Sequence, residues 1–173
     1  MDNEEMQQGI AAVAEEGGFS VKDVQDALEQ GLTTVREMKG ISDGEMEAIY
    51  ALASNFYRTG NYENAETLFR FLVMFDHLNA KYWMGLGAVR QVQKRFKEAI
   101  DAYALVVTTL DFTNVKASFY AAECHLALGD RVNAMSAIEH VKYSADVKTE
   151  EGRTFLAKAK HLEKVIAAAG TEA

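Results

Sequence analysis

The sequence predicts an all-α protein built as a helical solenoid, with three helix-turn-helix repeats, N-terminal helices and a C-terminal capping helix. Three observations lead to this fold class. Apolar and small residues recur at the spacing i, i+3, i+4, i+7, which marks one face of a helix. These faces repeat with a period of about 34 residues. The chain has 173 residues and no proline, a composition that suits helices throughout.

The helical faces come in pairs with a fixed internal spacing. Each second face begins 16 positions after the first (from 49 to 65, from 83 to 99 and from 118 to 134), and the pairs follow one another after 34 and 35 positions. This pattern is the signature of tetratricopeptide repeats. The six faces consist of Ile49, Leu52, Ala53 and Phe56; Ala65, Leu68, Phe69 and Leu72; Trp83, Leu86, Gly87 and Arg90; Ala99, Ala102, Tyr103 and Val106; Ser118, Ala121, Ala122 and His125; and Ala134, Ala137, Ile138 and Val141.

A left-handed turn is expected between the two helices of each pair. Gly60 and Gly129 occupy equivalent positions there, and glycine adopts a positive φ without steric cost. The middle pair has Lys94 at this position, where a left-handed residue should cost about 1–2 kcal/mol.

The extra residue of the second period is expected in the linking stretch 110–115. The helices are expected at 46–59, 62–75, 80–93, 96–109, 115–128 and 131–143.

Residues 1–40 carry none of the repeat positions. Amphipathic helices are expected here, the second of them running from Ser20 to Lys39 and ending at Gly40. Helices of this length are not stable alone, so an apolar stripe on the second one must be covered. We expect this stripe to contribute to a homodimer. It consists of Val24, Leu28, Leu32 and Val35.

Two further helix starts complete the expected domain organisation. Ser42 with Glu45 three positions later begins the first repeat, and Glu150 with Glu151 begins a terminal helix where negative charge suits the helix dipole. Solenoids need such a terminal helix with a polar outer face. We therefore expect an N-terminal, dimerising region at 1–40, three repeats at 41–145 and a capping helix at 146–173.

Composition and charge exclude several classes of protein. The net charge is −8 and the pI is about 5.0, which argues against nucleic acid as a direct partner. The acidic start is unlike a signal peptide, and no apolar run approaches the ~20 residues that span a bilayer. The single Cys124 allows no internal disulfide, which agrees with a reducing compartment. A cytoplasmic protein without membrane insertion is expected.

No catalytic, cofactor or metal site is predicted. The sequence Gly85-Leu86-Gly87 lies within a helix and lacks the lysine and hydroxyl residue of a phosphate-binding loop. Cys124 and His125 are adjacent, but neighbours on a helix point about 100° apart, so a buried thiol is expected instead of a shared metal ion. We therefore expect a protein that is not an enzyme.

A binding surface is predicted on the first helices of the pairs, which line the concave side of such a solenoid. Many residues expected there are apolar or aromatic, and soluble proteins avoid large exposed apolar patches. A terminal helix covers some of them, or they bind an extended peptide with a few apolar anchors; for the whole set we favour the peptide. The predicted groove residues are Tyr50, Ser54, Tyr57, Arg58, Lys81, Met84, Ala88, Gln91, Val92, Phe119, Glu123 and Leu126, with Arg58 and Lys81 at its edge.

Four segments carry a resemblance to a known family. They are Ala48 to Ala53, Phe69 to His77, Gly85 to Gln91 and Ala121 to Gly129, and the resemblance covers about 41 to 142. The chain resembles the class II chaperones of bacterial type III secretion systems. It departs from them after the second repeat, where that family often has a proline and this chain has Thr113-Asn114-Val115.

This resemblance implies a cytoplasmic bacterial chaperone that holds hydrophobic, pore-forming translocator proteins before export. It implies binding of a short extended segment with apolar and proline anchors in the concave groove, dimerisation through N-terminal helices and, in some members, action with an AraC-type transcription activator. No ATP site is implied. The alternative is a scaffold that joins two folded partners through the same repeats. Co-expression separates the two, because a chaperone should solubilise secreted apolar proteins.

Overall fold

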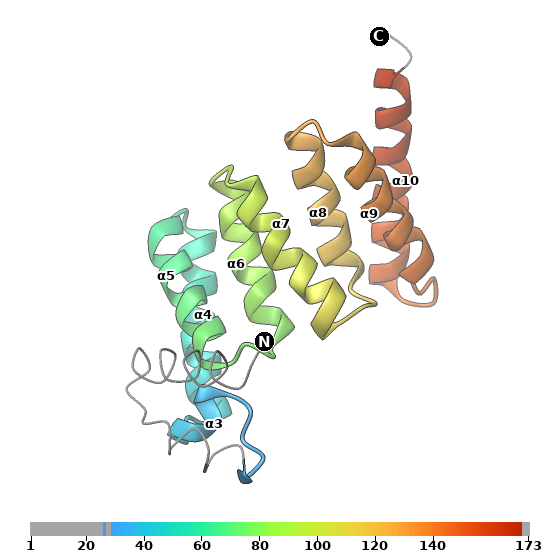
Figure 1. Ribbon diagram of the computed structural model, residues 1–173. Helices are drawn as coiled ribbons and strands as arrows, with labels where there is room; N and C mark the ends of the chain where they lie inside the picture. The colour runs from blue at the N-terminus through green and yellow to red at the C-terminus, as the bar shows by residue number, and fades with distance from the viewer. Residues whose placement is uncertain (1–25, 27–28, 171–173) are drawn as a thin grey trace, which may run out of the picture. The chain divides into compact units, whose positions relative to one another are not determined.

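The computed structural model describes residues 26 and 29–170, which form helices and the segments that join them (Figure 1). The chain divides into two compact units, Met1–Glu45 and Met46–Ala173. Every regular element in the described part is helical, which confirms the predicted fold class. The elements are α3 (Val35–Lys39), α4 (Asp43–Arg58), α5 (Tyr62–Phe75), α6 (Ala80–Val92), α7 (Phe96–Leu105), the π-helix η1 (Val106–Leu110), α8 (Val115–Ala127), α9 (Arg131–Ser144) and α10 (Glu150–Gly170).

The prediction of a single helix from Ser20 to Lys39 is wrong. Gly31 has a φ of 76°, and the chain leaves the helix there. Thr34 then caps a new helix, α3, through a reciprocal pair of hydrogen bonds with Glu37, at 3.2 Å for the Glu37 N–H and 3.0 Å for the Thr34 N–H. The end of this helix at Gly40, with a φ of 66°, is as predicted.

The predicted dimer stripe is affected by this break. Leu32 lies between the two helical segments and Val35 is the first residue of α3, so the two do not share one helix face. Val24 and Leu28 lie outside the described residues. The role of these four residues in a dimer stays a prediction, and it no longer rests on a continuous helical stripe.

The first repeat begins where the sequence predicts, at Ser42. The Ser42 hydroxyl accepts from the Glu45 N–H at 3.3 Å, and the Glu45 carboxylate accepts from the Ser42 N–H at 2.9 Å. The Ser42 hydroxyl also donates to the Glu45 carboxylate at 2.7 Å. The bonds to this carboxylate from the Ser42 hydroxyl and then from the Ser42 N–H lower the pKa of Glu45. They let α4 start at Asp43, three residues earlier than expected.

The three helix pairs are α4 with α5, α6 with α7, and α8 with α9. Figure 1 shows the later pairs stacked in sequence, with α7 against α8 and α10 against α9, and these pairs of helices are in contact. Gly60, Lys94 and Gly129 all have the predicted left-handed conformation, with φ of 79°, 61° and 77°. In every turn the next backbone N–H donates to the carbonyl five positions earlier at 2.9 Å: Asn61 to Phe56, Arg95 to Arg90 and Asp130 to His125.

The extra residue of the second period lies inside a helix, which contradicts its predicted place at 110–115. The links 76–79 and 111–114 have the same length, and each ends at an asparagine that caps the next helix. Instead, α7 continues into the π-helix η1, whose last turn is closed by the Asp111 N–H and the Val106 carbonyl at 2.7 Å. A π-helix holds more residues per turn than an α-helix, so this wider turn takes up the insertion.

Most of the predicted repeat positions are buried or half-buried, and one is exposed. The small residues at the second-helix positions, Ala65, Ala99 and Ala134, are fully buried. Leu52 was expected in the core, but 48% of its surface is exposed. Its equivalent Ala121 packs on residues of the preceding pair, whereas in the described part of the chain no helix pair precedes α4. The position that Leu52 occupies is therefore buried in the later pairs but exposed in the first pair.

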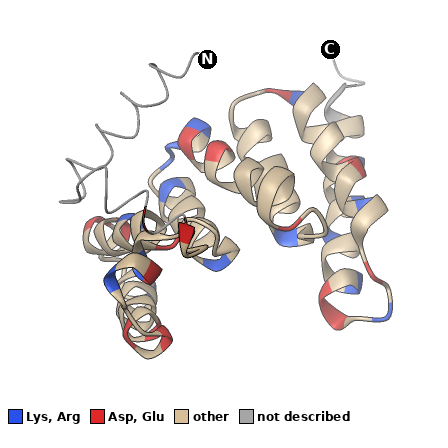
Figure 2. Ribbon diagram, turned by 60° about the horizontal axis from the view of Figure 1, so that its bottom comes forward, with Lys and Arg blue, Asp and Glu red and all other residues tan. Residues whose placement is uncertain are grey.

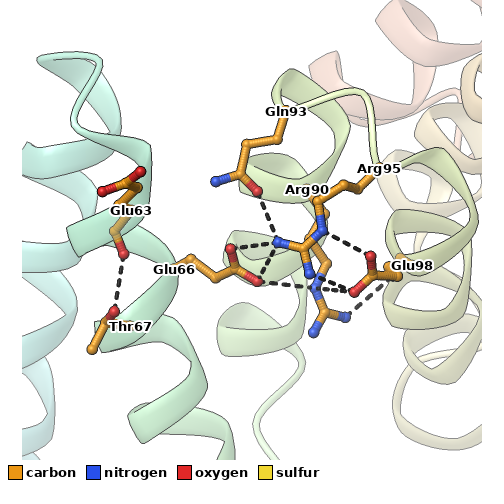
Figure 3. A network of polar contacts seen from close by, with 7 residues as sticks. All are labelled: Glu63, Glu66, Thr67, Arg90, Gln93, Arg95 and Glu98. Atoms are coloured by element: carbon orange, nitrogen blue, oxygen red, sulfur yellow. Dashed lines mark hydrogen bonds and ion pairs between the residues drawn. The ribbon is translucent and has the colours of Figure 1, made fainter.

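A polar network joins α5, α6 and α7 (Figure 3). Arg95 donates to both carboxylate oxygens of Glu66, at 2.6 and 2.8 Å, and to the Glu98 carboxylate at 2.5 and 2.7 Å. Arg90 lies beside the same two carboxylates and donates to the Glu98 carbonyl oxygen at 3.3 Å. Two cations thus face two anions, and the network is neutral as a whole.

Candidate peptide-binding groove

A cavity of about 480 Å³ lies along the first helices of the repeats. It contains six of the twelve predicted groove residues, namely Tyr50, Ser54, Tyr57, Arg58, Lys81 and Met84. We call this cavity the groove. Its remaining lining comes from α5, α6, the start of α8 and α10, through Phe69, Gly85, Asn114, Lys116 and Glu151.

Aromatic rings form the floor of the groove. The rings of Tyr50 and Phe69 meet edge to face, with centroids 5.9 Å apart, and Tyr50 lies equally far from Tyr82. Gly85 is needed here, because a Cβ atom at this position would lie 2.2 Å from the ring of Phe69. The floor is therefore packed tightly while the outer edge of Tyr50 still lines the cavity.

Tyr57 lies at one end of the groove against Tyr62, with ring centroids 5.8 Å apart. Its burial, and then the neighbouring Tyr62, raise the pKa of Tyr57 above its ordinary value of 10.0. The phenol therefore stays protonated at neutral pH and offers a hydrogen-bond donor next to an apolar ring.

The rim of the groove carries positive groups. The Lys81 ammonium donates to the Glu47 carboxylate at 2.6 Å and lies 3.8 Å from the centre of the Tyr50 ring. Arg58 donates to the Asn55 side chain at 3.3 Å. Figure 2 shows positive and negative positions interspersed over the described helices, so this rim is a local feature of a chain with a net charge of −8.

The lining of the groove also includes an ion pair between Lys116 of α8 and Glu151 of α10. Lys116 occupies the same repeat position as Lys81, 35 residues later. The repeat register could therefore have predicted Lys116 as a lining residue of the groove. Glu151 comes from outside the repeats. Only the folding of α10 back onto α8 brings it to the groove.

Four of the predicted residues lie beyond the cavity. Gln91 donates to Glu123 at 3.1 Å and accepts from the Tyr103 hydroxyl at 2.9 Å, so both side chains are engaged within the protein. Ala88 is half-buried and Val92 is exposed. They lie on the same helix as Met84, at its carboxyl end.

Phe119 and Leu126 are not groove residues in this structure, and their prediction is corrected. Phe119 is only 5% exposed and packs against Phe155 of α10, with ring centroids 5.5 Å apart. Leu126 packs on the same apolar cluster of α8, α9 and α10. The terminal helix covers these two positions, which is the alternative that the sequence left open.

The chemistry of the described residues agrees with the expected buried thiol. Cys124 is fully buried, and this burial raises its pKa to about 12. Among the described residues, histidine, cysteine and carboxylate side chains do not gather into a group of three that could hold a metal ion. None of the helices in the described part of the chain is both long and apolar enough to cross a membrane.

The fold and the groove define a tetratricopeptide-repeat protein. The family model of the tetratricopeptide repeat matches residues 46–79 and 80–114, the first two of the three pairs. The third pair keeps the same turn and the same buried small residue, Ala134.

Comparison with known proteins assigns the chain to a narrower family. It is 37% identical to the chaperone protein SicA of Salmonella typhimurium over 116 residues, which are 67% of this chain and 69% of SicA. A solved structure of PcrH in complex with the chaperone binding region of PopD is 32% identical, with a TM-score of 0.71 over 76% of this chain and 97% of that one. The type III secretion translocator chaperone SycD of Yersinia enterocolitica, in its alternative dimer, is 29% identical, with a TM-score of 0.69 over 75% and 97% of the two chains. The chain belongs to this family, the class II tetratricopeptide-repeat chaperones of type III secretion translocators.

Proposed function

We propose that this chain holds an extended, apolar segment of a translocator protein in the groove and keeps that protein soluble in the bacterial cytoplasm until export. The observation that carries the proposal is the groove itself, an aromatic floor with a positive rim. PcrH, a relative of the same fold, is solved with the chaperone binding region of PopD.

The geometry suits an extended peptide. Its apolar side chains would lie on Tyr50, Tyr57 and Met84, while its free backbone carbonyls would meet the donors of Arg58 and Lys81. Each buried apolar anchor contributes roughly 1.5–3 kcal/mol before ordering costs are subtracted. A few anchors give binding that is useful and still reversible, as export requires.

A homodimer is proposed as the form in which the chain works. SycD, of the same family, is solved as a dimer. The first unit carries the apolar positions predicted for such an interface, of which Leu32 and Val35 are half-buried in the described part. Deletion of residues 1–40 should then lower the subunit count in sedimentation, and an unchanged count would contradict the proposed interface.

The groove is tested by the double substitution Tyr50→Ala and Tyr57→Ala. We expect binding of the secreted client to fall about 100-fold or more, since aromatic anchors carry a disproportionate share of affinity. Titration of a labelled peptide from the apolar segment of the client measures the affinity, and thermal melts measure the stability.

Leu72→Ala is the matched control, because Leu72 is fully buried in α5 and lies outside the groove lining. It should cost about 2–5 kcal/mol of stability and leave the affinity of the folded fraction unchanged. Wild-type affinity in the double tyrosine variant would show that the groove is not the client site. Unfolding of that variant like Leu72→Ala would instead assign the tyrosines to the core.

A further inference from the structure

A second cavity of about 480 Å³ lies on a different face of the same repeats. We call it the α5–α6 pocket. It uses α6 residues that do not line the groove, namely Trp83, Leu86 and Arg90, so its occupation is independent of the groove. Its α5 side is formed by Thr67, Arg70, Phe71, Val73 and Met74.

Five of the eight residues that line the α5–α6 pocket are apolar, and two aromatic rings among them are held in place. The Trp83 indole N–H donates to the His77 carbonyl at 2.8 Å, which fixes the ring. Phe71 stacks on Phe75, with ring centroids 4.2 Å apart. Met74 is 59% exposed, and Leu78 just beyond α5 is 49% exposed. Apolar surface therefore continues out of the pocket, which is typical of a contact site for another protein.

The charged residues that line the pocket are both arginines. Arg90 is ion-paired through Nε with Glu66 at 3.6 Å and Glu98 at 3.9 Å, and one terminal nitrogen donates to the Glu98 carbonyl. Its other terminal nitrogen has no hydrogen bond to the described residues. Arg70 is exposed and forms no ion pair with the described part of the chain. Glu66, the α5 carboxylate nearest to Arg70 in sequence, pairs instead with Arg95 at 2.6 Å and with Arg90 at 3.6 Å.

The positive charges of Arg70 and Arg90 restrict which kind of peptide can bind in the α5–α6 pocket. In a chain of net charge −8, an apolar pocket that offers guanidinium donors selects a segment with carboxylates beside its apolar side chains. Guanidinium and carboxylate groups match in planar, two-bond geometry. A basic or purely apolar segment would leave the Arg70 guanidinium and one terminal nitrogen of Arg90 without a partner on binding.

We infer that the α5–α6 pocket docks an acidic, apolar peptide segment of a partner protein, separately from the client in the groove. An aliphatic or aromatic side chain of that segment lies between Trp83 and Met74. A neighbouring carboxylate reaches Arg70 and the free nitrogen of Arg90. The chaperone thereby binds a client and a second protein at the same time through opposite faces of α6.

The test uses the full chain and a short synthetic peptide in which leucine and phenylalanine lie between aspartates. Trp83 is the only tryptophan, so its emission reports directly on the pocket. We expect a saturable change in emission with the aspartate peptide and none with a twin peptide that has lysines in place of the aspartates. Arg70→Glu should weaken binding about tenfold or more.

Two further variants separate the pocket from its surroundings. Met74→Glu puts a carboxylate on the exposed wall and should weaken binding as Arg70→Glu does, while both variants keep the wild-type circular dichroism spectrum. Lys160→Glu makes the same change in net charge as Arg70→Glu, but at an exposed position of α10, and should bind as the wild type does. The Tyr50→Ala and Tyr57→Ala variant should also bind this peptide normally, whatever its effect on the client.

Three outcomes overturn the inference. Equal binding of the aspartate and lysine peptides means that charge does not select the occupant. Wild-type affinity in Arg70→Glu means that the pocket is not the site. A lower subunit count for Arg70→Glu in sedimentation means that a second copy of this chain occupies the pocket in place of a partner.

Discussion

At the scale of single residues, Lys94 is the clearest conflict between local preference and repeat geometry. It is left-handed, with a φ of 61°, at a turn where the other two repeats have glycine. The repeat keeps the conformation because the turn makes the same hydrogen bond, from Arg95 to Arg90 at 2.9 Å, as its glycine counterparts. The strain is therefore maintained by the packing of the helix pair.

Lys94→Gly should raise the free energy of unfolding by about 1 kcal/mol, because glycine removes the steric cost of the left-handed conformation. Denaturant unfolding measures the change. Lys97→Gly is the control, since Lys97 is exposed inside α7 and its replacement should lower stability by about 1 kcal/mol. A loss of stability with Lys94→Gly would mean that the lysine side chain makes a contact worth more than the strain.

The repeat register predicted which direction several side chains take from their helix, although their role in binding stays a prediction. Tyr50, Tyr57 and Met84 line the cavity because their positions relative to Ile49 and Trp83 fix the face of the helix. Phe119 has an equally clear register, yet it is buried against Phe155. Register gives the direction of a side chain, whereas its exposure depends on a helix from elsewhere in the chain.

At the scale of elements, helix starts were read correctly from local hydrogen-bonding pairs, as Ser42 with Glu45 shows. The break at Gly31 was missed because the apolar spacing from Val24 to Val35 continues through it. Thr34 with Glu37 was the signal that outweighed this spacing, since a reciprocal cap begins a helix and cannot lie within one.

The stability that the start of α4 contributes should depend on pH, because Glu45 must be ionised to keep its hydrogen bonds with Ser42. Its pKa is below the ordinary 4.5, because the Ser42 hydroxyl and then the Ser42 N–H bind the charged form. A lowered pKa in the folded state adds stability above the pKa of the unfolded chain, and this stability is lost as the pH falls through the lower, folded value. Stability from this carboxylate is thus present above about pH 4.5 and disappears below it.

Thermal melts of the wild type and Glu45→Gln from neutral pH down to about pH 2 check this expectation. The wild type should melt at a higher temperature above pH 4.5, and the difference should close on further acidification. A difference that stays constant over the whole range would show that the effect of the substitution does not come from the charge.

At the scale of the whole repeat unit, α10 completes both the core and the groove. Its residues Phe155 and Ala159 are buried against α8 and α9, while Glu151 pairs with Lys116 at the groove. Gly152 permits this docking, because a Cβ atom there would lie 2.1 Å from the Asp146 carbonyl oxygen. The sequence predicted the capping helix but not its contribution to the lining of the groove.

Ala159→Glu should release α10 from the repeats, since a carboxylate without a partner is costly in a fully buried position. Phe119 would then be uncovered, and we expect stronger binding of a hydrophobic fluorescent dye together with weaker client binding. Lys160→Glu, one position further on the exposed face, should leave both unchanged. Normal dye binding in Ala159→Glu would show that the cap does not depend on this contact.

The π-helix at the end of α7 has a consequence for how the repeats of this chain are compared. An insertion inside η1 leaves the positions on both sides, Ala99 before it and Val115 after it, in their buried places. When the second pair is aligned with the first, the one-residue gap therefore belongs within η1, although sequence alignment methods favour gaps in loops. The longer second period is thus a local change of helical pitch, and the third pair stays in register with the first two.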